Sequence, residues 1–323
     1  MTTKKQVSKI IIIITVIFLA IITTSCNKET ETLKVAWMTT WTDGGLTAQA
    51  LKNTDILEKN NANAEMISFL YGPPMVEAAL SNQVDVLFVG WVPAVNLMSK
   101  SDDWIIVSKL AYFPMELMAR EGSGIQSVND LKNKKIGVPY ATGPYPHVVN
   151  SLKEKGLIAG KDYELVNLKP SDMGTALERA YVDAVSWSEP SLTLFAQKKL
   201  AYPIEEYTDI SFIVVSKSYA ENHPEQMKNF LKAIKEAQFY VSQHKEEVFG
   251  WFAEESRFDL SLVKSLKIIE PNYDANSIEE VDLTISDFWI KETQKKIDFE
   301  YQEGILSKKL VLSKKIDQSY ISD

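Results

Sequence analysis

The sequence predicts an α/β fold built around a mainly parallel sheet. Short apolar runs alternate with helical patterns from residue 33 to about residue 100, a spacing typical of βαβ units. Residues 84–89 form a near-continuous apolar run, which suits a strand covered on both faces. Ligands of such sheets bind beyond the carboxyl ends of the strands, so the turns that follow the strands are the first candidates for a site.

Composition limits the class of protein. The chain has 323 residues, of which 45% are hydrophobic and 24% charged, so it is long enough for two globular domains. Its net charge is −8, and its arginines are Arg120, Arg179 and Arg257. Because phosphate contacts need clustered basic side chains, this balance disfavours a nucleic-acid partner.

The N-terminus is predicted to be an export signal covering residues 1–25. Three lysines precede the apolar run 10–22, and small polar residues then lead to Cys26. Cys26 resembles the lipidation cysteine of bacterial lipoproteins, which implies a membrane anchor made by acyl chains. Thr23 stands where such signals usually carry Leu, Val or Ile, so an ordinary secretory signal with a free thiol is the alternative. Residues 26–32 are expected to be a linker.

The first part of the mature chain alternates predicted strands and helices. Strands are expected at 33–38, 66–70 and 84–89, and the turns 41–45, 71–74 and 90–93 each open a helix. Residues 104–111 and 115–119 are two further extended runs. Gly122 and Gly124 then break the chain before a short helix near 128–131. We place the first crossing to a second unit here.

The second unit begins with the strand, turn and helix of residues 134–147. Ile136 and Val138 supply the strand, and the turn 141–143 leads into a helix that ends near Gly156. The pattern then predicts strands at 165–168 and 182–187, helices at 171–180 and 192–196, and a return strand at 212–215. From Pro224 the spacing is helical, with segments expected at 224–241, 245–254, 260–266 and 277–303.

Five segments resemble a known family, the substrate-binding components of ABC importers for nitrate, sulfonate and taurine, which also includes thiamine-precursor binders. They follow the family order: residues 69–74 with 77–80 and 84–86; residues 90–94; residues 122–125 through 130–139; residues 182–184 with Trp187, Glu189 and Pro190; and residues 219–225. Ser188 is a one-residue departure from the family pattern Trp-Glu-Pro. The resemblance covers roughly residues 33–303.

This resemblance implies a periplasmic-binding-protein-like type II fold, with two α/β lobes joined by a two-strand hinge and followed by C-terminal helices. Lobe 1 would comprise residues 33–113 plus 212–323, and lobe 2 residues 114–211. One small solute would bind in the cleft between the lobes, with hinge closure upon it. The implied partners are an ABC permease and its ATPase, and the implied location is extracytoplasmic.

Carrying over the family pocket position by position gives the expected ligand-facing residues. They are Trp41, Asp43, Tyr71, Gly72, Gly90, Trp91, Thr142, Gly143, Tyr145, His147, Trp187 and Glu189. The aromatic residues among them are expected to form an aromatic cleft, and packing at the strand ends is the alternative. The Thr142 hydroxyl and the N–H groups after it are expected to bind an oxyanion. His147 and Glu189 have structural alternatives at helix starts.

The ligand stays open between two classes. A small sulfonate or taurine-like solute is the first prediction, and a thiamine-precursor pyrimidine or other aminated aromatic solute is the alternative. No arginine falls on the expected turns, whereas Asp43, Glu116 and Glu189 lie on or near them. An enzyme like the thiamine-pyrimidine synthases is disfavoured because those carry a cysteine cluster and Cys26 is the only cysteine here. We expect no cofactor, no metal and no catalytic residues.

Overall fold

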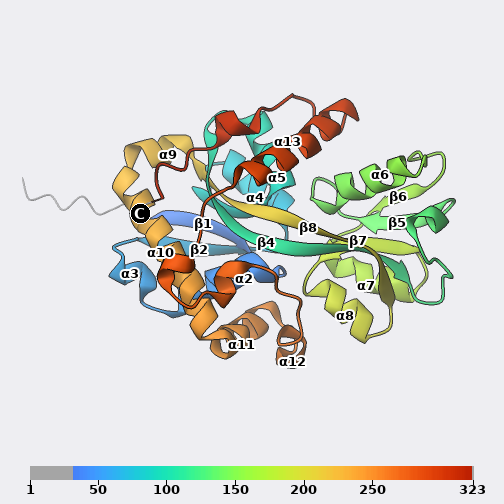
Figure 1. The fold of residues 1–323 in the computed structure, drawn as a ribbon, viewed down its shortest axis with the longest axis horizontal. Coiled ribbons are helices and arrows are strands. Elements are labelled where there is room, and N and C mark those ends of the chain that lie inside the picture. The colour runs from blue at the N-terminus through green and yellow to red at the C-terminus, as the bar shows by residue number, and fades with distance from the viewer. Residues whose placement is uncertain (1–31, 322–323) are drawn as a thin grey trace, which may run out of the picture. The chain divides into compact units, whose positions relative to one another are not determined.

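The computed structural model describes residues 32–321, and Leu33–Asp323 form one compact unit. The predicted signal peptide, Cys26 and most of the expected linker lie outside the described residues. One eight-stranded sheet organises the fold, in the order β2-β1-β3-β8-β4-β7-β5-β6 (Figure 1). Its strands are β1 (Leu33–Met38), β2 (Ala64–Phe69), β3 (Val86–Gly90), β4 (Trp104–Arg120), β5 (Lys135–Val138), β6 (Glu164–Asn167), β7 (Ala184–Ser188) and β8 (Ala201–Ser216).

The sheet is parallel at both ends and antiparallel at its centre. β1 pairs in parallel with β2 and β3, and β5 pairs in parallel with β6 and β7. β8 runs antiparallel to β3 and β4, and β7 runs antiparallel to β4. The prediction of an α/β sheet is confirmed, but its mainly parallel character holds only for the two ends.

Two long strands, β4 and β8, connect the ends of the sheet. The sequence suggested two separate runs in place of β4, yet the strand continues through Pro114, which pairs in register with Thr208. Only residues 212–215 of β8 were predicted. Residues 202–208 carry many polar side chains and are all partly or fully exposed, so this part of β8 lacks the apolar run by which its far end is recognised.

Helices cover both faces of the sheet (Figure 1). At the β1–β3 end, α2, α10 and α11 lie on one face and α4 and α5 on the other, whereas α6 and α7 lie on opposite faces at the β5–β7 end. The helices are α2 (Thr42–Asn53), α3 (Ile56–Lys59), α4 (Gly72–Leu80), α5 (Trp91–Lys100), α6 (Pro144–Glu154), α7 (Pro170–Glu178), α8 (Ser191–Gln197), α9 (Lys217–Asn222), α10 (Pro224–Gln243), α11 (Lys245–Ser256), α12 (Leu260–Val263) and α13 (Asp287–Gln302). Short 3-10 helices are Val128–Leu131, Pro271–Asp274, Ile278–Glu280 and Leu312–Lys315.

The C-terminal helix is shorter than predicted. Residues 277–303 were expected to be one helix, but only Ile278–Glu280 and α13 are helical. The Asp282 side chain accepts hydrogen bonds from the N–H and hydroxyl of Thr284, at 2.8 and 2.7 Å, which favours a turn over a helix. The hydroxyl of Ser286 then caps the start of α13 by accepting from the N–H of Trp289.

Apolar side chains form three buried clusters. The largest takes its members from Leu33 to Met115 and from Ile210 to Tyr320. Two smaller clusters lie among residues 117–204, one around Leu131 and Ile136 and the other around Met173 and Trp187. The predicted lobe boundaries fall within β4 and β8 and stay a prediction; Met115 and Ile210, which the prediction assigns to lobe 2, belong to the largest cluster.

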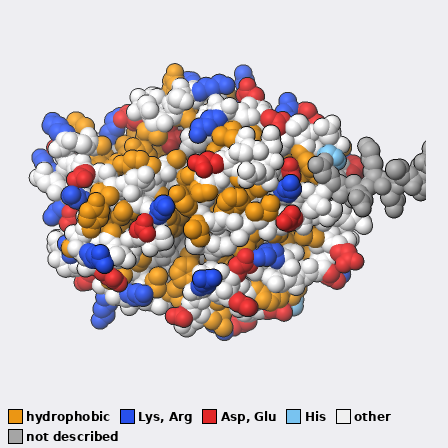
Figure 2. All heavy atoms as spheres, turned by 180° about the vertical axis from the view of Figure 1, so that it is seen from behind, with side chains coloured by type: hydrophobic (Ala, Val, Ile, Leu, Met, Phe, Trp, Pro, Cys, Tyr) orange, Lys and Arg blue, Asp and Glu red, His pale blue; other side chains and the backbone are white. Residues whose placement is uncertain are grey.

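Acidic and basic side chains are interspersed on the face that Figure 2 shows, with apolar side chains between them. Some of the surface charges form ion pairs, for example Lys267 with Glu206 and Lys315 with Asp102. The acidic balance of the chain is therefore spread over the surface in this view.

Candidate functional site

A narrow pocket lies where the turns after β1, β2, β3, β5 and β7 meet the central strands. Seven of the twelve expected site residues line it: Trp41, Gly72, Gly90, Trp91, Thr142, Gly143 and Trp187. The other lining residues are Met38, Pro93, Phe113, Met115, Pro144, Ser188 and Asp209. The cavity volume is about 40 Å³, which is room for no more than a few water molecules. A larger solute therefore requires the walls to move apart.

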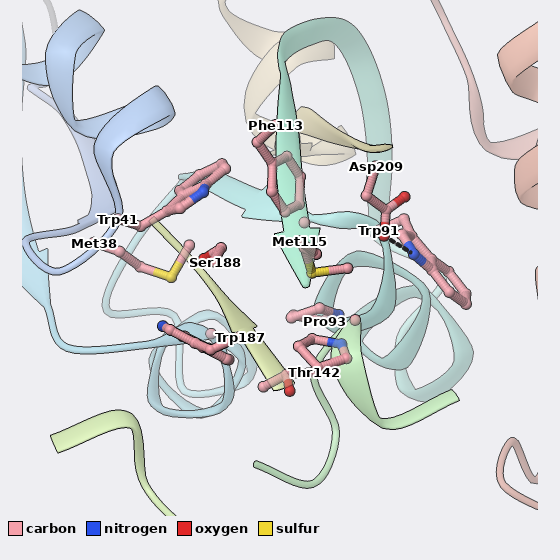
Figure 3. Close-up of a pocket in the computed structure, with 14 residues that line it drawn as sticks. Met38, Trp41, Trp91, Pro93, Phe113, Met115, Thr142, Trp187, Ser188 and Asp209 are labelled. Carbon is pink, nitrogen blue, oxygen red and sulfur yellow. Dashed lines mark hydrogen bonds between the residues drawn. The ribbon is translucent and has the colours of Figure 1, made fainter. Parts of the chain in front are cut away.

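The walls of the pocket are aromatic and sulfur-rich. Trp41 packs edge-to-face on Phe113, with ring centroids 5.1 Å apart. Figure 3 shows Trp41 above and Trp187 below the side chain of Met38, with Met115 to their right, between Phe113 and Pro93. The indole nitrogens of Trp41 and Trp187 are buried and have no hydrogen-bond partner within the described residues. Because buried donors are almost always paired, these two N–H groups are the first candidates for hydrogen bonds to a bound solute.

Glycines allow the turns to approach one another closely. A Cβ on Gly72 would lie 2.6 Å from the Pro93 ring, and one on Gly143 would lie 3.1 Å from Cε of Met115 and 3.3 Å from Oδ2 of Asp209. Gly72 and Gly143 therefore bring two strand-to-helix turns against the opposite wall.

The start of α6 provides fewer donors than the sequence suggested. Pro144 and Pro146 have no N–H, and the N–H of Tyr145 donates to the Thr142 carbonyl at 3.2 Å. The Thr142 hydroxyl donates to the Pro139 carbonyl at 2.5 Å. Thr142 lines the pocket, but its hydroxyl proton is engaged within the turn, and its contact with an oxyanion stays a prediction.

Asp209 on β8 is a buried charged residue in the pocket wall that the sequence analysis missed. Its Oδ2 accepts from Nε1 of Trp91 at 2.7 Å and contacts Nε2 of His147 at 3.3 Å, and its Oδ1 accepts from Nζ of Lys296 at 2.8 Å. Burial alone would raise the pKa of Asp209, but the Lys296 ammonium and the His147 contact lower it to about 2. Asp209 is therefore ionised at neutral pH.

His147 lies behind the pocket wall. It lines a neighbouring groove of about 380 Å³ together with Glu292, Lys295 and Lys296, and its ring stacks on Tyr207 at 4.0 Å. Burial lowers the pKa of His147, and the contact with Asp209 only partly opposes this. The imidazole is therefore neutral at pH 7. It does not line the pocket itself but contacts Asp209, which does.

Four more expected residues lie outside the pocket. Tyr71 lines a separate groove of about 310 Å³, and Tyr145 packs on Tyr140 with ring centroids 4.7 Å apart. Glu189 accepts hydrogen bonds from the N–H and hydroxyl of Thr193, so it has the structural role at a helix start that was its alternative. Asp43 is buried, and neither carboxylate oxygen has a hydrogen-bond partner in the described structure. Burial, followed by the Glu270 and Glu189 charges, raises the pKa of Asp43.

Residues 32–321 contain neither a candidate metal site nor a candidate membrane-spanning helix. No group of three or more His, Cys, Asp or Glu side chains is arranged to hold a metal ion in this part of the chain. In the same residues, no helix has the length and apolar character needed to cross a membrane.

Sequence comparison identifies relatives that are named as binding proteins for sulfonates or taurine. The chain is 26% identical over 275 residues to a putative aliphatic sulfonates-binding protein of Bacillus subtilis, covering 83% of this chain and 80% of that protein. It is also 26% identical over 190 residues to the taurine-binding periplasmic protein of Escherichia coli, covering 56% of this chain and 58% of that protein.

Structure comparison agrees on the fold. The alkanesulfonate-binding protein SsuA from Xanthomonas axonopodis, bound to MOPS, superposes with a TM-score of 0.73 at 17% identity, covering 90% of this chain and 99% of that one. The nitrate-binding protein NrtA from Synechocystis gives a TM-score of 0.70 at 13% identity, covering 90% and 87%. Residues 104–248 match the family model described as NMT1/THI5 like. The predicted resemblance is confirmed at this level: residues 104–248 are similar to the NMT1/THI5-like family model, in a chain that has the periplasmic binding protein fold.

Proposed function

We propose that this protein is the extracytoplasmic solute-binding component of an ABC importer and binds a small organic sulfonate or a taurine-like solute. One observation carries the proposal: the unpartnered indole N–H groups of Trp41, in the turn after β1, and Trp187, near the end of β7, are buried in the walls of one pocket. Two such donors suit the oxygens of a sulfonate. The names of the Bacillus and Escherichia relatives support the same class of solute.

Binding is proposed to close a hinge formed by β4 and β8. In this scheme lobe 1 comprises residues 33–113 plus 212–323, lobe 2 comprises residues 114–211, and Trp41 and Trp187 approach the solute from different lobes. The cavity volume of about 40 Å³ supports this scheme because a solute enters only when the lobes separate. The solute favours closure by binding the closed state more tightly than the open one.

A thiamine-precursor pyrimidine or other aminated aromatic ring is the second candidate. The observation that favours it is the wall chemistry: Trp41, Trp91, Phe113 and Trp187 line the pocket, whereas no Lys or Arg is among its described lining residues. Aromatic faces bind flat rings by stacking and cationic groups by cation–π contact. Binding followed by release to a permease and its ATPase, without a chemical step, is the proposed activity for either solute.

The attachment to the membrane is proposed to be a lipid on Cys26 after removal of residues 1–25. Radiolabelled palmitate should label the wild-type chain in bacterial cells, whereas Cys26→Ala should remain unlabelled. An unlabelled wild-type chain would favour the ordinary secretory signal.

The test of the proposed function is a ligand screen by thermal shift, followed by calorimetric titration. The chain from residue 26 onward is screened against taurine, ethanesulfonate, nitrate, bicarbonate and thiamine precursors. A ligand that binds the folded state raises the melting temperature by mass action. We expect a shift with a sulfonate. A shift with a pyrimidine and none with any sulfonate would establish the second candidate instead.

A further inference from the structure

Asp209 is the ionisable side chain of the pocket wall. The other residues that line the pocket between Met38 and Ser188 carry aromatic, aliphatic, thioether or hydroxyl side chains, or are glycines. Asp209 has no exposed surface. The charge that the pocket presents to a solute therefore depends on how this carboxylate is compensated.

Protein groups occupy the acceptor positions of the Asp209 carboxylate. Oδ1 accepts from Nζ of Lys296 at 2.8 Å and from the N–H of Ile210 at 2.9 Å. Oδ2 accepts from Nε1 of Trp91 at 2.7 Å and contacts Nε2 of His147 at 3.3 Å. A carboxylate accepts about four hydrogen bonds, so Asp209 needs no donor from a solute.

Lys296 reaches Asp209 from outside the pocket. It is on α13, and its side chain lines the neighbouring groove of about 380 Å³ rather than the pocket itself. Its ammonium lies 5.8 Å from the ring centroid of Trp91 and 5.9 Å from that of Trp289. These two indoles help to hold the ammonium against the carboxylate.

The other titratable groups around Asp209 do not supply a positive charge at neutral pH. His147 on α6 is neutral because burial lowers its pKa. Tyr207, on β8 itself, stacks on His147 and forms a hydrogen bond with the Ser186 hydroxyl, and Glu205 on the same strand accepts from Ser151. Lys296 is thus the cation that balances Asp209.

We propose that Lys296 is a specificity-determining residue that acts through Asp209: by neutralising this carboxylate, it allows the pocket to accept an anionic or uncharged solute. This inference rests on the proposed function, since it concerns the solute of the same pocket. Without Lys296 the pocket wall would carry an uncompensated negative charge. Such a charge repels an anion strongly in a pocket from which water is excluded.

The test measures binding of ethanesulfonate by calorimetry at pH 5 and pH 8 with charge variants. Lys296→Met should weaken binding at pH 8 by about tenfold or more, and much less at pH 5, where Asp209 takes up a proton. The double variant D209N/K296M should recover most of the lost affinity, because Asn carries no charge. D209N alone leaves Lys296 in place, so it should bind at least as tightly as the wild type.

The matched control is Lys295→Met. Lys295 is the neighbouring residue, lines the same groove and pairs with Glu292 on the helix surface, so its loss should leave the affinity within about twofold. A Lys296→Met variant that binds like the wild type at pH 8, or a double variant no better than Lys296→Met, would overturn the inference. If Lys296→Met does not fold, D209N decides: weaker binding of ethanesulfonate than in the wild type would also overturn it.

A second measurement needs no solute and separates this inference from the proposed function. The indole N–H resonance of Trp91 reports the ionisation of Asp209, its hydrogen-bond partner. In the wild type, we expect Asp209 to cause no change in the chemical shift of this resonance between pH 4 and 8. In Lys296→Met, we expect the chemical shift to change within this range because Asp209 takes up a proton there. A wild type that binds no sulfonate would refute the sulfonate proposal, whereas an unchanged Trp91 resonance in Lys296→Met would refute the role of Lys296.

Discussion

Glu116 and Glu206 lie directly opposite each other in the antiparallel pair of β4 and β8. Like charges at opposed positions of a sheet repel, and Glu116 is also largely buried. Burial, followed by the Glu206 and Glu189 charges, raises the pKa of Glu116 from 4.5 to about 7. Between these two values the folded protein holds a proton that the unfolded chain has released. The free energy of unfolding therefore falls as the pH rises through this range.

The first prediction is that Glu116→Gln removes this part of the pH dependence. The contribution of Glu116 amounts to at most about 3 kcal/mol, and it is lost between pH 4.5 and pH 7. Urea unfolding at pH 5 and pH 8 should show a smaller difference in the variant than in the wild type. The exposed Glu65 on β2 provides the control, since Glu65→Gln should leave the difference unchanged. Equal pH dependence in Glu116→Gln and the wild type would contradict the raised pKa.

The second prediction concerns the unpartnered indoles. Trp187→Phe keeps an aromatic ring but removes an N–H that has no partner within the described structure. If this N–H binds the solute, affinity for a sulfonate should fall by about tenfold, the loss expected for a hydrogen bond to a charged group. Calorimetric titration measures the change.

Trp37→Phe is the matched control for Trp187→Phe. The Trp37 indole nitrogen is also buried and unpartnered in the described structure, but Trp37 is inside β1 and does not line the pocket. Its replacement should remove the same atoms from the interior and leave the affinity unchanged. Equal loss of affinity in both variants would mean that the effect comes from packing rather than from the donor.

The third prediction uses the close approach at Gly143. A methyl group there would lie 3.1 Å from Cε of Met115 and 3.3 Å from Oδ2 of Asp209, so Gly143→Ala should narrow the pocket and weaken binding. The φ angle of −50° suits alanine, so the turn itself should still form. Thermal melts measure the effect of the substitution on stability, and calorimetric titration measures its effect on affinity.

Gly250→Ala is the comparison for Gly143→Ala. Gly250 is within α11 and has no neighbour within 4 Å of the added carbon, so the change should stabilise the helix by about 0.5–1 kcal/mol without altering binding. Unchanged affinity in Gly143→Ala would show that the solute does not approach this turn.

The sequence predicted the pocket residues at the carboxyl ends of strands and in the turns that follow, and it missed those inside the long strands β4 and β8. Gly72, Gly90, Trp91, Thr142, Gly143 and Trp187 belong to recognisable strand-to-helix turns, and the carboxyl ends of neighbouring strands meet at one edge of a sheet. Phe113 and Met115 are in a strand buried on both faces, where an apolar pattern does not indicate which side chains face the pocket. The structure is needed to choose between the two faces.

The Asp209 network was missed for a different reason. Trp91 is 118 positions before Asp209 in the chain and Lys296 is 87 positions after it. The sequence around each of these residues gives no sign that the three side chains meet. An acidic residue near the apolar end of β8 was a weak signal, because exposed strand positions often carry acids. Only the pairing of β8 with β3 and β4, together with the position of α13, brings these charges to one point.

The fourth prediction concerns the ion pair of Lys109 and Glu270, which ties β4 to the segment before Pro271. Nζ of Lys109 lies 2.7 Å from Oε1 of Glu270, and the two side chains are 3% and 0% exposed. Oε2 of Glu270 accepts from the N–H of Tyr112 at 2.7 Å. Lys109→Met leaves the Glu270 charge buried without its cation, which should cost about 3–5 kcal/mol in the free energy of unfolding.

The double variant K109M/E270Q distinguishes a stranded charge from lost packing. The amide that replaces the Glu270 carboxylate is uncharged and can still accept from the N–H of Tyr112, so the double variant should be more stable than Lys109→Met alone. The exposed pair of Lys245 and Asp274 is the control, and Lys245→Met should cost no more than about 1 kcal/mol. A double variant no more stable than Lys109→Met would mean that the uncompensated charge of Glu270 is not what destabilises Lys109→Met.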